Sequence, residues 1–377
     1  MSKPSSAVTE VNGGTTPITA ATEDVGEDDD VDCDVVGKDG INNDDCVKTL
    51  DVLSLDSIRN TLIRQEETII FALIERAQFR QNSICYKPGA MGTLGTPPGS
   101  REVPKTTNGD DECPQSFLEY MLAGTEALHC GVRRYTSPEE HAFFPDRLPP
   151  GIMDALNELE YPSDLLSPIG GACDVNFNPI LLEKYIKVIV PSIAVVGDDE
   201  QHGSTVLCDI ALLQALSRRV HYGKFVAESK YRSDPEGYQA LVDAGDADGV
   251  MALLTNQAVE EMVLRRARLK AATYGQEPLL ASLPPIGSTT SSRDTTSIVA
   301  AAAASAVVAA IEAMGDDENS NSNNKVCPST VEAVYRDLII PMTKDVEVAY
   351  LFLRCGREPP PEYAPDRMSR DVTRLIL

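Results

Sequence analysis

Cationic and hydrogen-bonding side chains recur at helical spacing within apolar segments of this chain, and together they could bind a small polar anion. Arg219 and Lys230 are 11 residues apart, a spacing that returns to nearly the same face if the helix is continuous through Gly223. Asn256 and Glu260 form an i,i+4 pair. Each pair could equally be a solvated stripe on an exposed helix face, so spacing alone leaves both interpretations open.

A carboxylate lies within the apolar sequence MTKDVEVAYLFL, where its environment decides its chemistry. Glu347 follows Thr343 by four residues, so the two side chains share one helix face. If that face is buried, desolvation raises the pKa of the carboxyl group and favours its protonated form. If the face is exposed, Glu347 could instead pair with Lys344.

Arg59 adds a second guanidinium, which Asp56 or Glu66 could neutralise on the same helix. Taken together, these positions offer cations, an amide, a hydroxyl and two carboxylates from four predicted helices. Such a set suits a small polar dianion bound inside a helical bundle.

The segments that carry these residues have the periodicity of amphipathic helices. Leu55, Ile58, Leu62, Ile69 and Leu73 repeat on one face, and alternating strand-length runs are rare. Helices are predicted at 55–79, 116–132, 178–190, 206–226, 235–244, 248–274 and 330–354. The sequence therefore predicts an all-α bundle of about ten or more helices packed around an interhelical active site.

Three segments have the composition of solvated chain. Residues 1–50 contain 12 acidic and 3 basic residues, which predicts a disordered acidic tail. Residues 87–113 are rich in Gly, Pro and Thr, and 278–325 end in Ser, Asn and Asp, so both are predicted to be flexible insertions. Residues 51–377 are predicted to be one helical domain that carries these insertions.

Charge and composition argue against several classes of function. The formal net charge of −25 repels phosphate backbones and anionic lipid, so neither nucleic acid nor a membrane is an expected partner. The nine cysteines include no CxxC pair and the four histidines lack metal-ligand spacing, so no metal site is predicted. The acidic N-terminus lacks an apolar signal segment. A cytoplasmic location is expected, although an unusual route to a plastid stays open.

Several long, collinear segments resemble the all-helical chorismate mutases of yeast and plants. They are IRNTLIRQEETIIFALIERAQF (58–79), RRYTSPEEHAFFPD (133–146), LSRRVHYGKFVAESKYRSDPEGY (216–238), TNQAVEEMVLRRA (255–267) and IIPMTKDVEVAYLFLR (339–354). The resemblance implies a cofactor-free enzyme that rearranges chorismate to prephenate in phenylalanine and tyrosine biosynthesis. Such an enzyme orients the substrate and stabilises the negative charge that develops on its ether oxygen.

The resemblance also implies roles for the catalytic residues. Arg59 and Arg219 match the arginines that bind the two substrate carboxylates, a task that suits a planar guanidinium. Lys230 matches the lysine that donates to the ether oxygen. Glu347 matches a glutamic acid that faces the same oxygen and must be protonated to donate a hydrogen bond.

Three further positions match residues that bind the substrate. Glu260 matches the residue that accepts a hydrogen bond from the ring hydroxyl, and Asn256 and Thr343 match lesser polar contacts. All seven positions hold the residue types that the family uses, so an active enzyme is predicted.

The resemblance further implies regulation at a dimer interface. Members such as the yeast enzyme bind tryptophan as an activator and tyrosine as an inhibitor, so these amino acids and a second copy of the chain are expected partners. Arg133 and Arg134 match arginines near the effector carboxylate. Gly203 and Ser204 match the loop around its amino group.

Two departures and two other classes of function stay open. Leu207 and Cys327 stand where the yeast-type protein has threonine, so the effector is not specified. Arg133 and Arg134 could simply be cations that favour a helix C-terminus. The chain could also be a non-catalytic module that binds an aromatic amino acid, or an acidic scaffold whose tail and alanine-rich insertion recruit partners.

Overall fold

The computed structural model of the chain describes residues 52–92, 94–100, 115–150, 165–274, 303, 306–307 and 325–365. These residues belong to one compact unit, Leu50–Leu377. Within them every regular element is a helix, and the predicted all-α class is confirmed. The acidic tail 1–50 lies outside the described residues, as do residues 101–113 of the first insertion and most of 278–325, so their flexibility stays a prediction.

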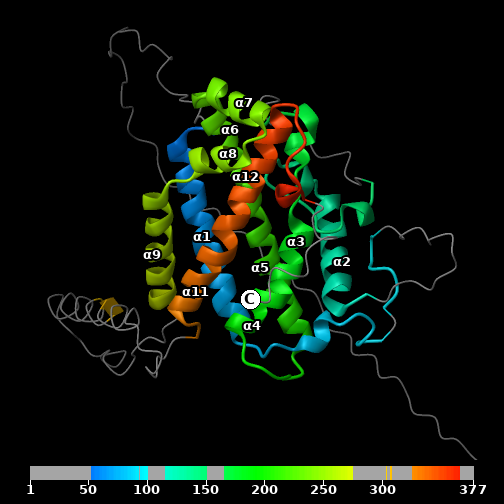
Figure 1. Cartoon of the computed structure of the whole chain (residues 1–377). Helices are drawn as coiled ribbons and strands as arrows, with labels where there is room; N and C mark the ends of the chain where they lie inside the picture. Colours follow the sequence, from blue (N-terminus) through cyan, green and yellow to red (C-terminus); the bar gives the residue numbers. More distant parts are fainter. Residues whose placement is uncertain are drawn as a thin grey trace, which may run out of the picture. The chain divides into compact units, whose positions relative to one another are not determined.

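The first helix, α1 (Leu55–Ala77), forms where the sequence supplies both a cap and an apolar stripe. The hydroxyl of Ser54 accepts a hydrogen bond from the amide of Ser57 at 3.3 Å, which satisfies one of the free donors at the helix start. Ile58, Ile69 and Leu73 are buried along one face. This helix packs beside α5 (His202–His221), and the two run together through the unit (Figure 1).

A capping box starts the next long helix, α2 (Phe117–Gly131). The hydroxyl of Ser116 accepts from the amide of Glu119 at 3.2 Å, and the Glu119 carboxylate accepts from the amide of Ser116 at 2.8 Å. The chain leaves α2 through Arg133, whose φ of 59° is left-handed. It then enters the short 3₁₀ helix η3 (Arg134–Thr136). This exit carries both predicted effector arginines, and Arg134 contacts Gln214 of α5.

Two long helical runs each contain a π-helical segment that ends two residues before a proline. In the first, α3 (Asn178–Lys184) continues through η6 (Tyr185–Ile189) into α4 (Val190–Ile193). In the second, α11 (Pro328–Val334) continues through η8 (Tyr335–Ile339) into α12 (Ile340–Arg354). Pro191 and Pro341 have no N–H to donate, and the proline ring crowds the preceding turn, which explains why the helix widens at these points.

Two predicted helices are each divided in two. Residues 206–226 belong to α5 and to α6 (Gly223–Ser233), which meet at Tyr222. Residues 248–274 belong to α8 (Ala247–Leu254) and α9 (Gln257–Tyr274). At the second break, Asn256 caps α9 by accepting a hydrogen bond from the amide of Val259 at 3.2 Å. Between the two pairs lies α7 (Pro235–Ala244), whose bounds match its prediction.

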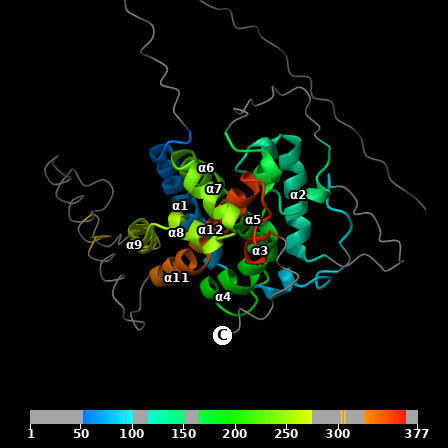
Figure 2. The ribbon, with the colours of Figure 1, turned by 45° about the horizontal axis from the view of Figure 1, so that its top comes forward.

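Helix α12 lies at the centre of the unit and joins its two apolar clusters. One cluster includes Leu73 of α1, Leu216 of α5 and Val346 of α12. The other includes Phe225 of α6 and Val348 of α12. Figure 2 shows α12 surrounded by α1, α5, α6 and α8. None of the described helices combines the length and the apolar character that a membrane span requires.

Candidate functional site

Arg219 of α5 is buried against α12, where Thr343 fixes its side chain. Its Nη1 donates to the Thr343 hydroxyl oxygen at 3.3 Å, and that hydroxyl donates to the carbonyl oxygen of Ile339 at 2.7 Å. Arg219 is only 7% exposed, and burial lowers the pKa of its guanidinium. Within the described part of the chain, no carboxylate forms an ion pair with it. A buried cation in this state is prepared to bind an anion.

Glu347 lies one helical turn after Thr343 and faces the same interior. It is 5% exposed, and its Oε2 is buried with no hydrogen-bond partner among the described residues. Burial raises the pKa of the Glu347 carboxyl to about 7, against the opposing charges of Lys230 and Arg219. Glu347 can therefore hold a proton near neutral pH and donate it in a hydrogen bond.

Lys230 of α6 approaches this pair from the other side. Its ammonium group donates to the carbonyl oxygen of Leu254 at the end of α8. Gly223, at the start of α6, lets this helix approach α12 closely. A Cβ at Gly223 would lie 2.8 Å from the carbonyl oxygen of Thr343 and 3.2 Å from Cγ of Glu347. The break between α5 and α6 thus brings both cationic helices against α12.

Glu260 and Asn256 lie at the edge of this group, near the start of α9. The Glu260 carboxylate pairs with Lys344 of α12 at 3.0 Å, and its charge contributes to the raised pKa of Glu347. Lys344 also lies 3.4 Å from the hydroxyl of Thr255. Asn256 is exposed, with its side-chain oxygen engaged in the helix cap. Lys344 therefore pairs with Glu260 rather than with Glu347.

Arg59 is not brought together with the other six predicted residues. It lies near the start of α1 and pairs with Asp56 at 2.7 Å, and the side chains of Arg59 and Asp56 are 59% and 88% exposed. This is the alternative partner that the sequence offered. Exposed pairs of this kind contribute only about 0–1 kcal/mol, so Arg59 can leave Asp56 at little cost.

A second group of buried charges, which was not predicted as part of the site, lies close to Arg219. Glu66 of α1 is 2% exposed and pairs with Arg266 at 2.8 Å and with Lys270 at 3.1 Å, both on α9. The hydroxyl of Tyr335 is buried without a partner in the described part of the chain, and burial raises its pKa while Arg219 and Arg266 act against that. Glu66 follows Arg59 by seven residues, so the two lie on one face of the predicted helix. This spacing was the only sequence pattern that could have indicated a role for Glu66 in the site.

Comparisons with known proteins place this arrangement in a family. The chain is 38% identical to "Chorismate mutase 1, chloroplastic" of Petunia hybrida over 84% of this chain and 80% of that protein. It is also 38% identical to the chorismate mutase of Schizosaccharomyces pombe, over 80% of this chain and 96% of that protein. The chain belongs to the chorismate mutase family. No family model matches it.

Solved chorismate mutases share the fold of this chain. The enzyme of Candida albicans in complex with L-Trp has a TM-score of 0.61 at 34% identity, covering 81% of this chain and 94% of that chain. AtCM1 with tyrosine bound in its allosteric site has a TM-score of 0.58 at 35% identity, covering 81% and 97%. The prediction of an enzyme of this family is therefore confirmed.

The predicted effector arginines, Arg133 and Arg134, follow α2, and Arg134 contacts α5. Arg134 donates from Nη1 to the side-chain oxygen of Gln214 at 3.1 Å and contacts Nδ1 of His129 at 3.0 Å. Its Nη2 pairs with Glu140 at 3.0 Å. Arg133 follows α2 with a left-handed φ, and its side chain is partly buried. Both terminal nitrogens of Arg134 thus contact this chain's own side chains.

Gly203 and Ser204 lie at the other end of α5, in its first turn, and both are exposed. Gln214, which contacts Arg134, follows Ser204 by ten residues. At 1.5 Å per residue, this places the two halves of the predicted effector site about 15 Å apart along α5. That distance is too large for the carboxylate and amino group of one amino acid, so one copy of the chain does not bring Arg134 and Ser204 together around it.

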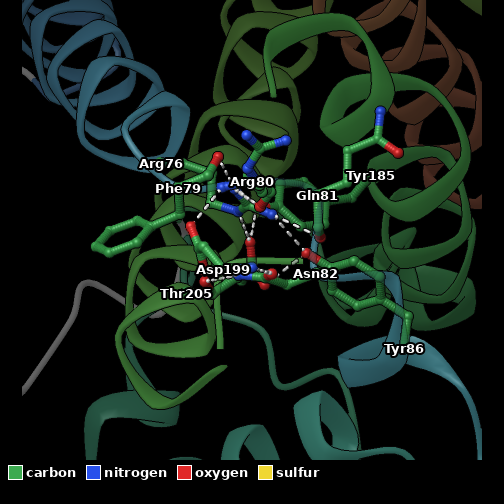
Figure 3. A network of polar contacts seen from close by, with 10 residues as sticks. Arg76, Phe79, Arg80, Gln81, Asn82, Tyr86, Tyr185, Asp199 and Thr205 are labelled. Carbon is green, nitrogen blue, oxygen red and sulfur yellow. Dashed lines mark hydrogen bonds and ion pairs between the residues drawn. The ribbon is translucent and has the colours of Figure 1, made fainter. Parts of the chain in front are cut away.

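A polar network anchors the loop that leads to Gly203 (Figure 3). The Asn82 side chain, which is fully buried, donates to Asp199 and to the Thr205 hydroxyl, both at 2.8 Å. It also accepts from the amide of Asp199 at 3.0 Å. The amide of Arg80 donates to the same carboxylate at 2.9 Å. Asn82 adopts a left-handed φ of 48° to make these contacts.

The same network continues into a buried ion pair. Arg76 of α1 and Asp209 of α5 are both fully buried and lie 2.6 Å apart. The hydroxyls of Tyr86 and Tyr185 donate to the Asp209 carboxylate at 2.9 and 2.5 Å. The end of α1 is therefore joined to the start of α5, which fixes the position of the turn that carries Ser204.

Proposed function

We propose that this chain converts chorismate to prephenate in the space between α5, α6, α9 and α12, without a cofactor. Two neighbouring buried groups carry the proposal. The guanidinium of Arg219 has no carboxylate partner among the described residues, and the carboxyl of Glu347 can stay protonated. A dianion with an ether oxygen needs both groups. The first binds a carboxylate, and the second donates to the oxygen.

The reaction breaks one C–O bond and forms one C–C bond, and no proton leaves the substrate. The enzyme must therefore supply orientation and electrostatic stabilisation. Arg219, held by Thr343, binds one carboxylate in a planar, bidentate geometry. Lys230 and protonated Glu347 donate to the ether oxygen as negative charge grows there.

The remaining predicted residues complete the substrate contacts. Arg59 leaves its exposed pair with Asp56 and binds the second carboxylate. Glu260, oriented by Lys344, accepts from the ring hydroxyl. Asn256 adds a polar contact from the start of α9, where its cap already holds it close to Glu260.

A chorismate-consumption assay on the purified full chain tests this assignment. The variant Arg219→Ala is expected to lose about 10²–10³-fold in kcat/KM, which is typical when a charge-stabilising donor is removed. Arg265→Ala is the matched control, because Arg265 is 81% exposed on α9. An Arg219→Ala enzyme as active as the wild type would refute the assigned site.

We also propose that the chain acts as a homodimer that binds tryptophan or tyrosine between its two copies. Arg134 contacts α5 at Gln214, about 15 Å along the helix from Ser204, so a second copy is needed to place its guanidinium beside Ser204. Related enzymes have been solved with L-Trp and with tyrosine bound. Sedimentation of the full chain, with and without each amino acid, tests this assembly, and a monomer that binds either one would contradict it.

We propose a cytoplasmic location. The relative from Petunia hybrida is a chloroplastic protein, so the plastid is the alternative location. A fluorescent fusion to the C-terminus of the full chain distinguishes the two, and a plastid signal would contradict the proposal.

A further inference from the structure

Glu140 is shared between the predicted effector site and the helix that carries Arg219. Its Oε2 pairs with Nη2 of Arg134 at 3.0 Å, and its Oε1 pairs with Nε of Arg218 at 2.8 Å. The Glu140 side chain is only 14% exposed. Arg218 directly precedes Arg219 in the last turn of α5. One carboxylate therefore contacts both an effector arginine and the turn that holds a catalytic arginine.

The next residue, His141, connects the same segment to α6. Its Nδ1 donates to the carbonyl oxygen of Glu140 at 2.7 Å, which leaves Nε2 to accept from the ammonium group of Lys224. Lys224 is fully buried and also donates to the carbonyl oxygen of Cys173 at 2.7 Å. It directly follows Gly223, which touches α12. The pair 140–141 thus contacts the helices of both catalytic cations.

This segment is anchored at each of its following residues as well. The carbonyl oxygen of Ala142 accepts from the side chain of Asn176 at 2.9 Å. The amides of Phe143 and Phe144 donate to the two oxygens of buried Glu126 at 2.6 and 3.0 Å. A segment fixed this closely moves as a unit, so a change at Glu140 is passed on rather than absorbed locally.

We propose that Glu140 couples effector binding to the active site, an inference that rests on the proposed function. An amino-acid effector whose carboxylate binds Arg134 competes with Glu140 for the same guanidinium. Glu140 then keeps only Arg218, and the balance of charge on the last turn of α5 changes beside Arg219. Glu140 is in this sense a positioning residue, because it reaches the substrate only through α5.

The test compares kcat/KM for chorismate with and without saturating L-tryptophan, L-tyrosine or L-phenylalanine. The wild type is expected to respond to at least one of them by about fivefold or more, as is common for coupled sites. In Glu140→Gln the amide keeps the shape but loses the charge, so the response is expected to fall below about twofold. Its activity without effector is expected to stay close to that of the wild type.

Two further variants keep the test decisive. Arg218→Gln removes the other half of the connection and is expected to lose the response as well, which covers the case in which Glu140→Gln does not fold. Glu183→Gln removes a carboxylate of α3 that is 30% exposed and pairs only with Lys187 of η6 among the described residues, and it should respond like the wild type.

The possible results separate the two proposals. A Glu140→Gln enzyme with a wild-type response would overturn the coupling while leaving the catalytic assignment intact. A wild type that consumes chorismate but responds to none of the three amino acids would also overturn it. A wild type that consumes no chorismate would overturn the proposed function and the coupling together.

Discussion

Replacing Glu347 by glutamine tests whether this buried carboxyl must be protonated for catalysis. Burial raises the pKa of this carboxyl from its ordinary value of 4.5 to about 7. The glutamate donates to the ether oxygen only when it is protonated, whereas an amide donates at every pH. Glu347→Gln should therefore remove one pH-dependent step without removing the hydrogen bond.

The size of the effect follows from that pKa. For a group that titrates near pH 7, the protonated fraction falls from about nine-tenths at pH 6 to about one-tenth at pH 8. The kcat/KM of the wild type reports the free enzyme and should fall about tenfold over this range. Glu347→Gln should hold a nearly constant kcat/KM. The control Glu261→Gln changes an exposed carboxylate of α9 and should follow the wild type.

The same variant carries a stability signature with a defined sign. Below pH 4.5 the carboxyl is protonated in both the folded and the unfolded chain, so it imposes no penalty. As the pH rises to 7, the unfolded chain ionises first, and the wild type loses up to about 3 kcal/mol of unfolding free energy. Urea denaturation should show that the unfolding free energy of Glu347→Gln rises relative to that of the wild type between pH 4 and pH 8. A variant whose activity and stability profiles both follow the wild type would refute this reasoning.

Two other substitutions test how the site is held in place. Gly223→Ala should reduce the unfolding free energy by about 1–3 kcal/mol, because the new Cβ would lie 2.8 Å from the carbonyl oxygen of Thr343. Thermal melting measures this change. An unchanged melting midpoint would contradict the close approach of α6 and α12. Asp209→Asn should cost about 3–5 kcal/mol, because it leaves the Arg76 guanidinium buried without its counter-ion. The exposed pair of Arg336 and Asp337 supplies the control Asp337→Asn, and equal melting of the two variants would argue against the buried ion pair.

The helices were largely predictable because periodicity and capping residues are local signals. The segment 235–244 starts at a proline after Asp234, whose side chain caps the helix, and ends at Gly245 in a left-handed conformation. Both signals are present in the sequence. The break at Tyr222 was not predictable in the same way, since the apolar pattern continues through it and the reason for the break is contact between Gly223 and α12.

The site was predictable only where a residue's role does not depend on distant partners. Glu347 could be singled out because its apolar neighbours surround it in the sequence. Glu66 and Arg266 are 200 residues apart, and no local pattern relates them. The exposed pair of Arg59 with Asp56 was a local alternative, and the structure contains it.

Thr343 holds Arg219 through a neutral oxygen, and this has a consequence for a protein with a net charge of −25. A carboxylate in the same place would fix the guanidinium equally well but would cancel its potential. The hydroxyl donates its proton to the carbonyl oxygen of Ile339 and accepts from Arg219, so the positive potential around Arg219 is preserved. An anionic substrate, repelled by the protein at long range, is then attracted over the last few ångströms of its approach.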